Sequence, residues 1–112
     1  MKTSELIGPA LDWAVAKCEG RKAAMWERKL RLFRTVGYDI NEYSPSTNWA
    51  QGGPIIDREK IDSSFAPDCN LWDCQTADQQ WCFSGLTLLS AAMRCYVASK
   101  LGDEVEIPKE LM

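Results

Sequence analysis

Apolar residues recur at spacings of three and four between residues 85 and 102, which is the period of an α-helix. A hydroxyl oxygen of Ser84 or Thr87 can cap the start of this helix, and Gly102 can end it. Because many of its side chains are small, another layer can approach closely, and we expect the remaining chain to pack on this helix. The apolar positions are Leu88, Ala91, Ala92, Cys95 and Ala98.

A second apolar stripe predicts another helix over residues 9–19. Leu11, Ala14, Val15 and Cys18 share one face, with Pro9 at the start and Gly20 at the end. A third, short helix is predicted from Gly53 to Ile61, because Gly53-Pro54 can begin a helix.

Alternating apolar and polar residues predict short strands over residues 39–43, 79–84 and 104–107. Residues 29–35 also fit a strand with Leu30 and Leu32 inward, although a helix over residues 21–34 fits as well. Residues 62–75 are polar and irregular, which favours a surface loop. The pattern therefore predicts a small α+β domain over residues 1–112, with two main helices, one short helix and a small, mostly antiparallel sheet.

The chain has 112 residues, the length of one domain, and its net charge of −3 argues against a general nucleic-acid binder. It has no apolar run long enough to span a membrane, and its N-terminus lacks the apolar segment of a signal peptide. We therefore expect a cytoplasmic protein without a membrane partner, whose five cysteines are reduced.

The segment from Tyr43 to Pro54 is the best binding candidate in the sequence. Tyr43 and Trp49 can stack on a planar ring, and Gly52 and Gly53 permit close approach of a ligand to the backbone. The alternative is a structural loop whose aromatic side chains fill the core. The polar side chains that can supply hydrogen bonds are Ser44, Ser46, Thr47, Asn48 and Gln51.

Arg94 lies beside the apolar stripe of the main helix and can bind an anionic group through two hydrogen bonds. The alternative is a surface ion pair with Asp57 or Glu59. If the two main helices lie beneath the segment from Tyr43 to Pro54, then Trp13, Tyr43, Trp49 and Arg94 can form one pocket.

Residues 21–34 contain six basic residues and one acidic residue, Glu27. This segment can contact phosphates, with Trp26 and Phe33 available for stacking. The alternative is a solvated face that is neutralised by acidic residues elsewhere. The basic residues are Arg21, Lys22, Arg28, Lys29, Arg31 and Arg34.

No set of catalytic residues is evident. The chain has no histidine, which removes the commonest general base and the usual partner of a thiol nucleophile. Cys69, Cys74 and Cys82 lack the spacing of a structural zinc site. We expect no cofactor and no metal, and we lean against an enzyme. A small carboxylate- or metal-dependent enzyme remains as an alternative, using Asp57, Glu59, Asp62 and Asp68.

Three stretches, at residues 11–17, 43–56 and 91–103, are together similar to the NinX-like proteins of tailed phages and prophages. The middle stretch reads YSPSTNWAQGGPII and the last reads AAMRCYVASKLGD. The resemblance implies a protein made in infected or lysogenic bacteria. That family has no assigned function and no assigned catalytic residues, so the resemblance transfers no site.

The leading hypothesis is a non-catalytic phage accessory protein. It would bind a small anionic or aromatic ligand, such as a nucleotide, or a host protein through the Trp- and Gly-containing loop, and so counter host defence or redirect host metabolism. The first alternative is a nucleic-acid accessory factor that uses residues 21–34, and the second is the small enzyme above. The apolar content also allows a homodimer.

Overall fold

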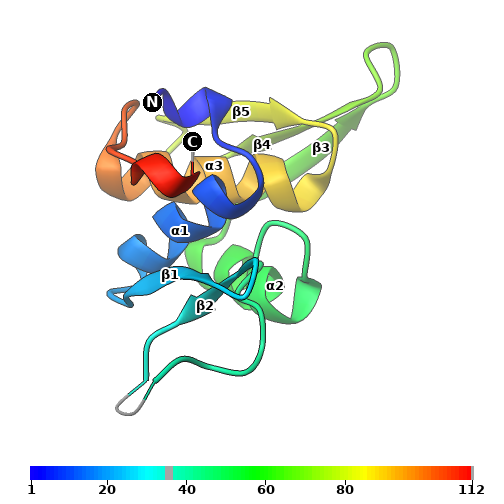
Figure 1. The fold of residues 1–112 in the computed structure, drawn as a ribbon. Helices are drawn as coiled ribbons and strands as arrows, with labels where there is room; N and C mark the ends of the chain where they lie inside the picture. Colours follow the sequence, from blue (N-terminus) through cyan, green and yellow to red (C-terminus); the bar gives the residue numbers. More distant parts are fainter. Residues whose placement is uncertain (35–36, 112) are drawn as a thin grey trace.

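The computed structural model describes residues 1–34 and 37–111. These residues form three α-helices and two antiparallel sheets, one of two strands and one of three, so the predicted α+β class is confirmed (Figure 1). There are two separate sheets where the sequence predicted one. The short helix is also as long as the first helix, since each has 11 residues.

The helix α3 (Leu88–Leu101) is the centre of the fold, as its pattern predicted. It is buried continuously from Ala91 to Ala98 and contacts α1, α2, β4 and β5 (Figure 1). The Thr87 hydroxyl accepts a hydrogen bond from the Ser90 amide at 3.1 Å and caps the helix. Gly102 ends the helix at a φ of +87°, a conformation that side chains disfavour.

The helix α1 (Gly8–Cys18) confirms the second predicted helix, and its apolar stripe packs on α3. The helix α2 (Trp49–Glu59) begins four residues before the predicted start at Gly53. The reason is the cap: the Asn48 side-chain oxygen accepts from the Ala50 amide at 2.9 Å. Pro54 therefore lies inside the helix, on its exposed side.

The strands β1 (Ala23–Trp26) and β2 (Lys29–Leu32) form a hairpin, which confirms the strand predicted from residue 29. The end of that prediction, at Thr35, lies outside the described residues. Leu30 and Leu32 are buried as expected. Between the strands, Glu27 and Arg28 both have positive φ, as tight hairpin turns require.

The surface loop predicted over residues 62–75 is wrong. Instead, β3 (Asp62–Ala66) and β4 (Leu71–Gln75) pair as a hairpin, and β5 (Cys82–Gly85) pairs with the other edge of β4. β3 is an edge strand with mostly exposed side chains, so its composition resembles that of a loop. The strand predicted over residues 79–84 begins only at Cys82, so Trp81 precedes it, although the Trp81 ring stacks on that of Phe83.

Two other predicted strands do not form. Residues 104–107 contribute only an isolated bridge between Glu104 and Lys2, which ties this segment to the N-terminus. Residues 39–43 lie beside β2 and are held there by two backbone hydrogen bonds. The Asp39 amide donates to the Leu32 carbonyl, and the Tyr43 amide donates to the Leu30 carbonyl. The Arg31 guanidinium donates to the carbonyls of Asp39 and Ile40, so a side chain replaces the ladder that a strand would form.

Candidate functional site

The polar side chains of residues 43–53 mostly hold this segment itself together. The Gln51 side chain accepts from the Ser44 amide at 2.6 Å and donates to the Glu42 carbonyl at 3.1 Å. Asn48 is engaged as the cap of α2. These groups already satisfy one another, which favours the structural alternative for this part of the predicted site.

Gly52 is required by packing. A Cβ atom at this position would lie 2.3 Å from the Pro45 carbonyl oxygen and 2.7 Å from a methyl carbon of Leu89. Only glycine therefore allows α2 to approach the preceding loop and the start of α3. Gly53 has room, because its nearest neighbour would be the Trp49 ring at 3.7 Å.

The loop before α2 is anchored on a buried carboxyl group of α1. The Ser46 amide donates to Asp12 at 2.8 Å, and the Asp12 side chain is almost completely buried. Burial raises the pKa of Asp12 to about 6, while hydrogen bonding from Ser46 opposes the rise and the charge of Glu42 adds to it. This contact joins the loop before α2 to the core.

Tyr43 and Arg94, both predicted as ligand contacts, point into the protein. Tyr43 is half-buried against the core, and burial raises its pKa to about 12. Arg94 is buried, and it donates from Nε to the Leu6 carbonyl at 2.8 Å and from Nη1 to the Ser84 carbonyl at 2.9 Å. Its guanidinium joins the N-terminal segment to β5, and among the described residues it forms no ion pair with Asp57 or Glu59.

An apolar groove of about 450 Å³ lies where the start of α2, β4 and the start of α3 meet. Trp49 and Leu86 stand at this groove with 57% and 79% of their surfaces exposed. None of the described residues that line it is ionisable. We call it the Trp49 groove; it is lined by Ser46, Thr47, Trp49, Trp72, Leu86, Thr87, Leu88 and Leu89.

The Trp49 groove contains three of the residues predicted as ligand contacts, namely Ser46, Thr47 and Trp49. The remaining predicted contacts do not line it, and neither does Trp13. Trp72 was not predicted as a contact, because the composition of residues 62–75 favoured a loop. The signal was present: two short runs that contain Phe65 and Trp72 flank a Pro-Asp-Cys-Asn turn, and the two rings pack at 5.1 Å.

A second cleft, of about 340 Å³, lies where α1 ends and the two-stranded sheet begins. We call it the Trp13 cleft; it is lined by Trp13, Lys17, Arg21, Lys22, Ala23 and Phe33. Three of its six lining residues are cations, and no described acidic residue lines it. Arg21 and Lys22 belong to the predicted basic segment.

The other basic residues of segment 21–34 lie elsewhere. Arg31 is engaged by backbone carbonyls, and Arg34 forms an ion pair with Asp39 at 3.5 Å. Arg28 lies in the hairpin turn, and Lys29 lies on β2 with its side chain exposed. The segment therefore does not present its six cations on one common face.

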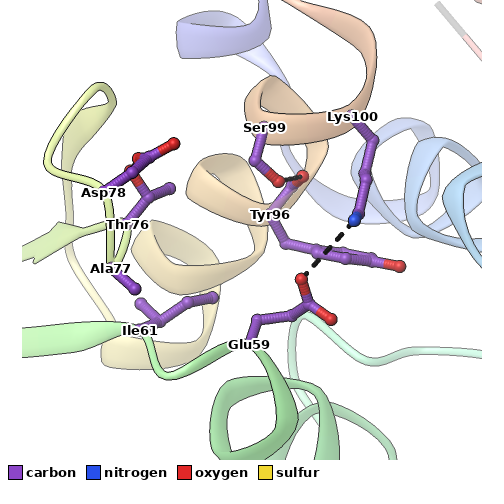
Figure 2. Close-up of a pocket in the computed structure, with 8 residues that line it drawn as sticks. All are labelled: Glu59, Ile61, Thr76, Ala77, Asp78, Tyr96, Ser99 and Lys100. Carbon is purple, nitrogen blue, oxygen red and sulfur yellow. Dashed lines mark hydrogen bonds and ion pairs between the residues drawn. The ribbon is translucent and has the colours of Figure 1, made fainter.

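A third cavity, of about 260 Å³, lies beside α3 (Figure 2). Its polar groups are paired locally: Lys100 lies 3.7 Å from Glu59, and the Ser99 hydroxyl donates to the Tyr96 carbonyl at 2.6 Å. Asp78 accepts from the Thr76 hydroxyl at 2.6 Å. Because these groups satisfy one another, the described residues that line the cavity present no unpaired nucleophile.

Tyr96 at this cavity belongs to a charged network that the sequence did not predict. Its hydroxyl donates to Glu19 and accepts from Arg58 at 3.1 Å, while Arg58 also binds Glu19 through two hydrogen bonds. Burial and the neighbouring carboxylate raise the pKa of Tyr96 above its usual range. The network joins the end of α1 to α2 and α3, and it keeps the phenol protonated.

Catalytic groups do not gather elsewhere in the described residues. No three Cys, Asp or Glu side chains of residues 1–34 and 37–111 are placed to hold a metal ion. Burial raises the pKa of Cys18 to about 11 and that of Cys74 to about 12, which keeps these thiols protonated. No helix in the described part of the chain is long and apolar enough to cross a membrane.

Fold and surface together define a small α+β protein with exposed aromatic clefts. A family model described as "Bacteriophage P22, NinX" matches residues 2–100. The chain therefore belongs to this bacteriophage NinX family, and the resemblance seen in the sequence is confirmed. A comparison with curated proteins finds no match.

Proposed function

We propose that this chain is a non-catalytic phage accessory protein that binds a host protein through the Trp49 groove. One observation carries the proposal: Trp49 and Leu86 remain largely exposed at the rim of an apolar groove of about 450 Å³. Large apolar side chains that gather at a concave surface are typical of protein interaction sites, where aromatic residues contribute most of the binding energy.

The chemistry of the groove favours an apolar protein segment over a small anionic ligand. No described lining residue is charged, so the groove offers no counterion for a phosphate or carboxylate. Asn48, Gln51 and Arg94, which could have bound such a ligand, are engaged within the protein. We therefore expect the partner to insert uncharged, apolar side chains.

Family membership supports a site of action in the cytoplasm of the infected cell, where phage proteins are made. There, the bound host protein would be inhibited or redirected to the advantage of the phage. In this proposal the protein acts by occupying a surface of its partner, so it requires no cofactor and no catalytic group.

The test begins with capture of a partner from a lysate of a bacterial host and continues with the purified pair. Calorimetry then compares the wild type with Leu86→Ser and with Ile40→Ser. Ile40 is a matched control, because 84% of its surface is exposed and it lies outside the groove. Leu86→Ser should weaken binding about tenfold, whereas Ile40→Ser should leave the affinity unchanged.

Three outcomes would count against the proposal. Equal loss in both variants would mean that binding does not use the groove. A small molecule that copurifies in native mass spectrometry and is lost in Trp49→Ala would assign the groove to that ligand. Self-association that Leu86→Ser abolishes would assign it to a second copy of the chain.

A further inference from the structure

In the Trp13 cleft, cations lie next to aromatic rings, and a backbone hydrogen bond at the ends of β1 and β2 holds part of this arrangement in place. Lys17 lies in the last turn of α1, Lys22 directly precedes β1, and Phe33 directly follows β2. The Phe33 amide donates to the Lys22 carbonyl at 2.8 Å, which holds these two residues opposite each other. This arrangement is therefore part of the folded sheet.

Lys17, Arg21 and Lys22 form no ion pair with a described acidic residue, although the charge of Arg21 helps to lower the pKa of Asp39. Two carboxylates near the cleft are engaged with other arginines: Glu19 with Arg58 at 2.7 Å, and Asp39 with Arg34 at 3.5 Å. Lys17, Arg21 and Lys22 thus concentrate positive charge around a concave surface. An anion that enters the cleft would relieve their mutual repulsion.

The aromatic side chains of the cleft provide surfaces for stacking. The Lys17 ammonium lies 5.5 Å from the centroid of the half-buried Trp13 ring. Phe33 is 43% exposed, and the Tyr38 ring contacts it edge to face at a centroid distance of 4.8 Å, which limits its rotation. A planar group in the cleft would therefore meet an aromatic ring and a cation together.

We propose that the Trp13 cleft binds one nucleotide unit, with its base on the aromatic rings and its phosphate at Arg21 and Lys22. The volume of about 340 Å³ lies within the usual range of small-ligand sites. Cations combined with aromatic platforms are how proteins bind nucleotides without reading their sequence. This site is separate from the Trp49 groove and does not depend on the function proposed there.

The nucleotide can be free or part of a single strand, and two probes distinguish these sources. The first is thymidine monophosphate, followed by calorimetry. The second is a fluorescent oligothymidylate of about ten nucleotides, followed by anisotropy at increasing salt. Binding of the monophosphate with comparable affinity would indicate a free nucleotide, and binding of the oligonucleotide alone would indicate a strand.

The variants use matched controls. Arg21→Ala combined with Lys22→Ala is compared with Lys109→Ala, an exposed lysine that does not line the cleft. Lys17 is left intact, because a cation in the last turn of a helix also offsets the helix dipole. Phe33→Ala is compared with Phe65→Ala, since the two rings are 43% and 44% exposed.

We expect the double variant and Phe33→Ala each to weaken binding by about tenfold or more, and both controls to change it less than about twofold. The double variant should also reduce the salt dependence by about one or two phosphate contacts. Equal losses in the controls would overturn the proposal, because binding would then be a general charge effect. Absence of binding to either probe at low salt would overturn it as well.

Discussion

The Trp49 groove and the Trp13 cleft are both concave surfaces with an exposed or half-buried tryptophan, but their neighbours differ. The groove is lined by apolar and hydroxyl side chains without any described charge, whereas half of the residues lining the cleft are cations. The same aromatic residue therefore occurs in two chemical settings. The groove suits the apolar side chains of a protein, and the cleft suits an anion with a planar ring.

The support beneath the two sites also differs. The groove is formed by segments far apart in the sequence, at residues 46–49, 72 and 86–89, which require close packing of α2 on the loop before it. The cleft is formed by neighbouring elements, α1 and the hairpin that follows it. The groove should therefore be the more sensitive of the two to changes in the core.

The largest effect is expected for Gly52→Ala, which would disturb the wall of the groove. The added Cβ would collide with the Pro45 backbone, so the variant should lose about 3 kcal/mol of folding free energy. Thermal and urea unfolding would measure this loss. Gly53→Ala is the control: it has room inside the same helix and should be neutral or slightly stabilising. Equal destabilisation of both variants would contradict the packing argument.

The next effect concerns the pH dependence of the anchor at Asp12. Because the folded pKa of Asp12, about 6, lies above the ordinary value of 3.8 for an aspartate, the folded state binds the proton more tightly. The contribution of this group to stability is therefore greatest at low pH and falls between about pH 4 and pH 6. The loss is on the order of 2 to 3 kcal/mol.

The Asp12→Asn variant isolates that contribution, because an amide oxygen can still accept from the Ser46 amide and does not titrate. Urea unfolding between pH 4 and pH 7 should show the wild type losing stability relative to the variant as pH rises. Glu19 and Asp78 have lowered pKa values, so their contributions change in the opposite direction, below about pH 4.5, and are common to both proteins. Parallel curves would refute the assignment.

A smaller effect separates the two sites directly. Trp49→Ala should reduce the free energy of binding between the groove and its protein partner by about 2 kcal/mol, as removal of an interface tryptophan commonly does. It should leave oligothymidylate binding at the Trp13 cleft unchanged, since the residue does not line that cleft. The same purified variant can be titrated with both ligands. Loss of both affinities would show that the sites are coupled.

The smallest expected change is the response of the groove to salt. Partner binding there should vary less than about twofold between low and physiological ionic strength, because none of the described residues that line the groove is charged. Nucleotide binding at the cleft should weaken steadily over the same range. Titrations of the two ligands in matched buffers would test this contrast. A steep salt dependence at the groove would point to charged contacts outside its lining.

Several parts of the fold could be predicted because their signals are local. The apolar stripes of α1 and α3 recur at the helical period, and Thr87 and Gly102 mark the ends of α3. Leu30 and Leu32 likewise indicated the buried face of β2. The β3–β4 hairpin was missed, because an edge strand with exposed side chains has the composition of a loop.

The candidate site was predicted only in part. The aromatic and small residues around Trp49 made that segment the binding candidate in the sequence, and Ser46, Thr47 and Trp49 line a groove in the structure. The hydrogen-bond partners of the other predicted polar residues could not be predicted from the sequence. The partners of Gln51 lie nearby in the chain, but Arg94 reaches the Leu6 carbonyl across 88 positions. Hydrogen bonds between residues so far apart in the sequence form only where tertiary packing brings the two residues together.

The sequence by itself determined the α+β class, the central helix, the family and the stretches that matter, because periodicity, caps and motifs are properties of neighbouring residues. Only the tertiary structure decided which side of each stretch faces solvent. In the folded protein, Arg94 and Asp12 are buried and form hydrogen bonds between distant segments, whereas Trp49 and Leu86 remain exposed. The physical reason is that burial and hydrogen-bond partners depend on distant segments meeting in space, and charge can be judged only among those neighbours.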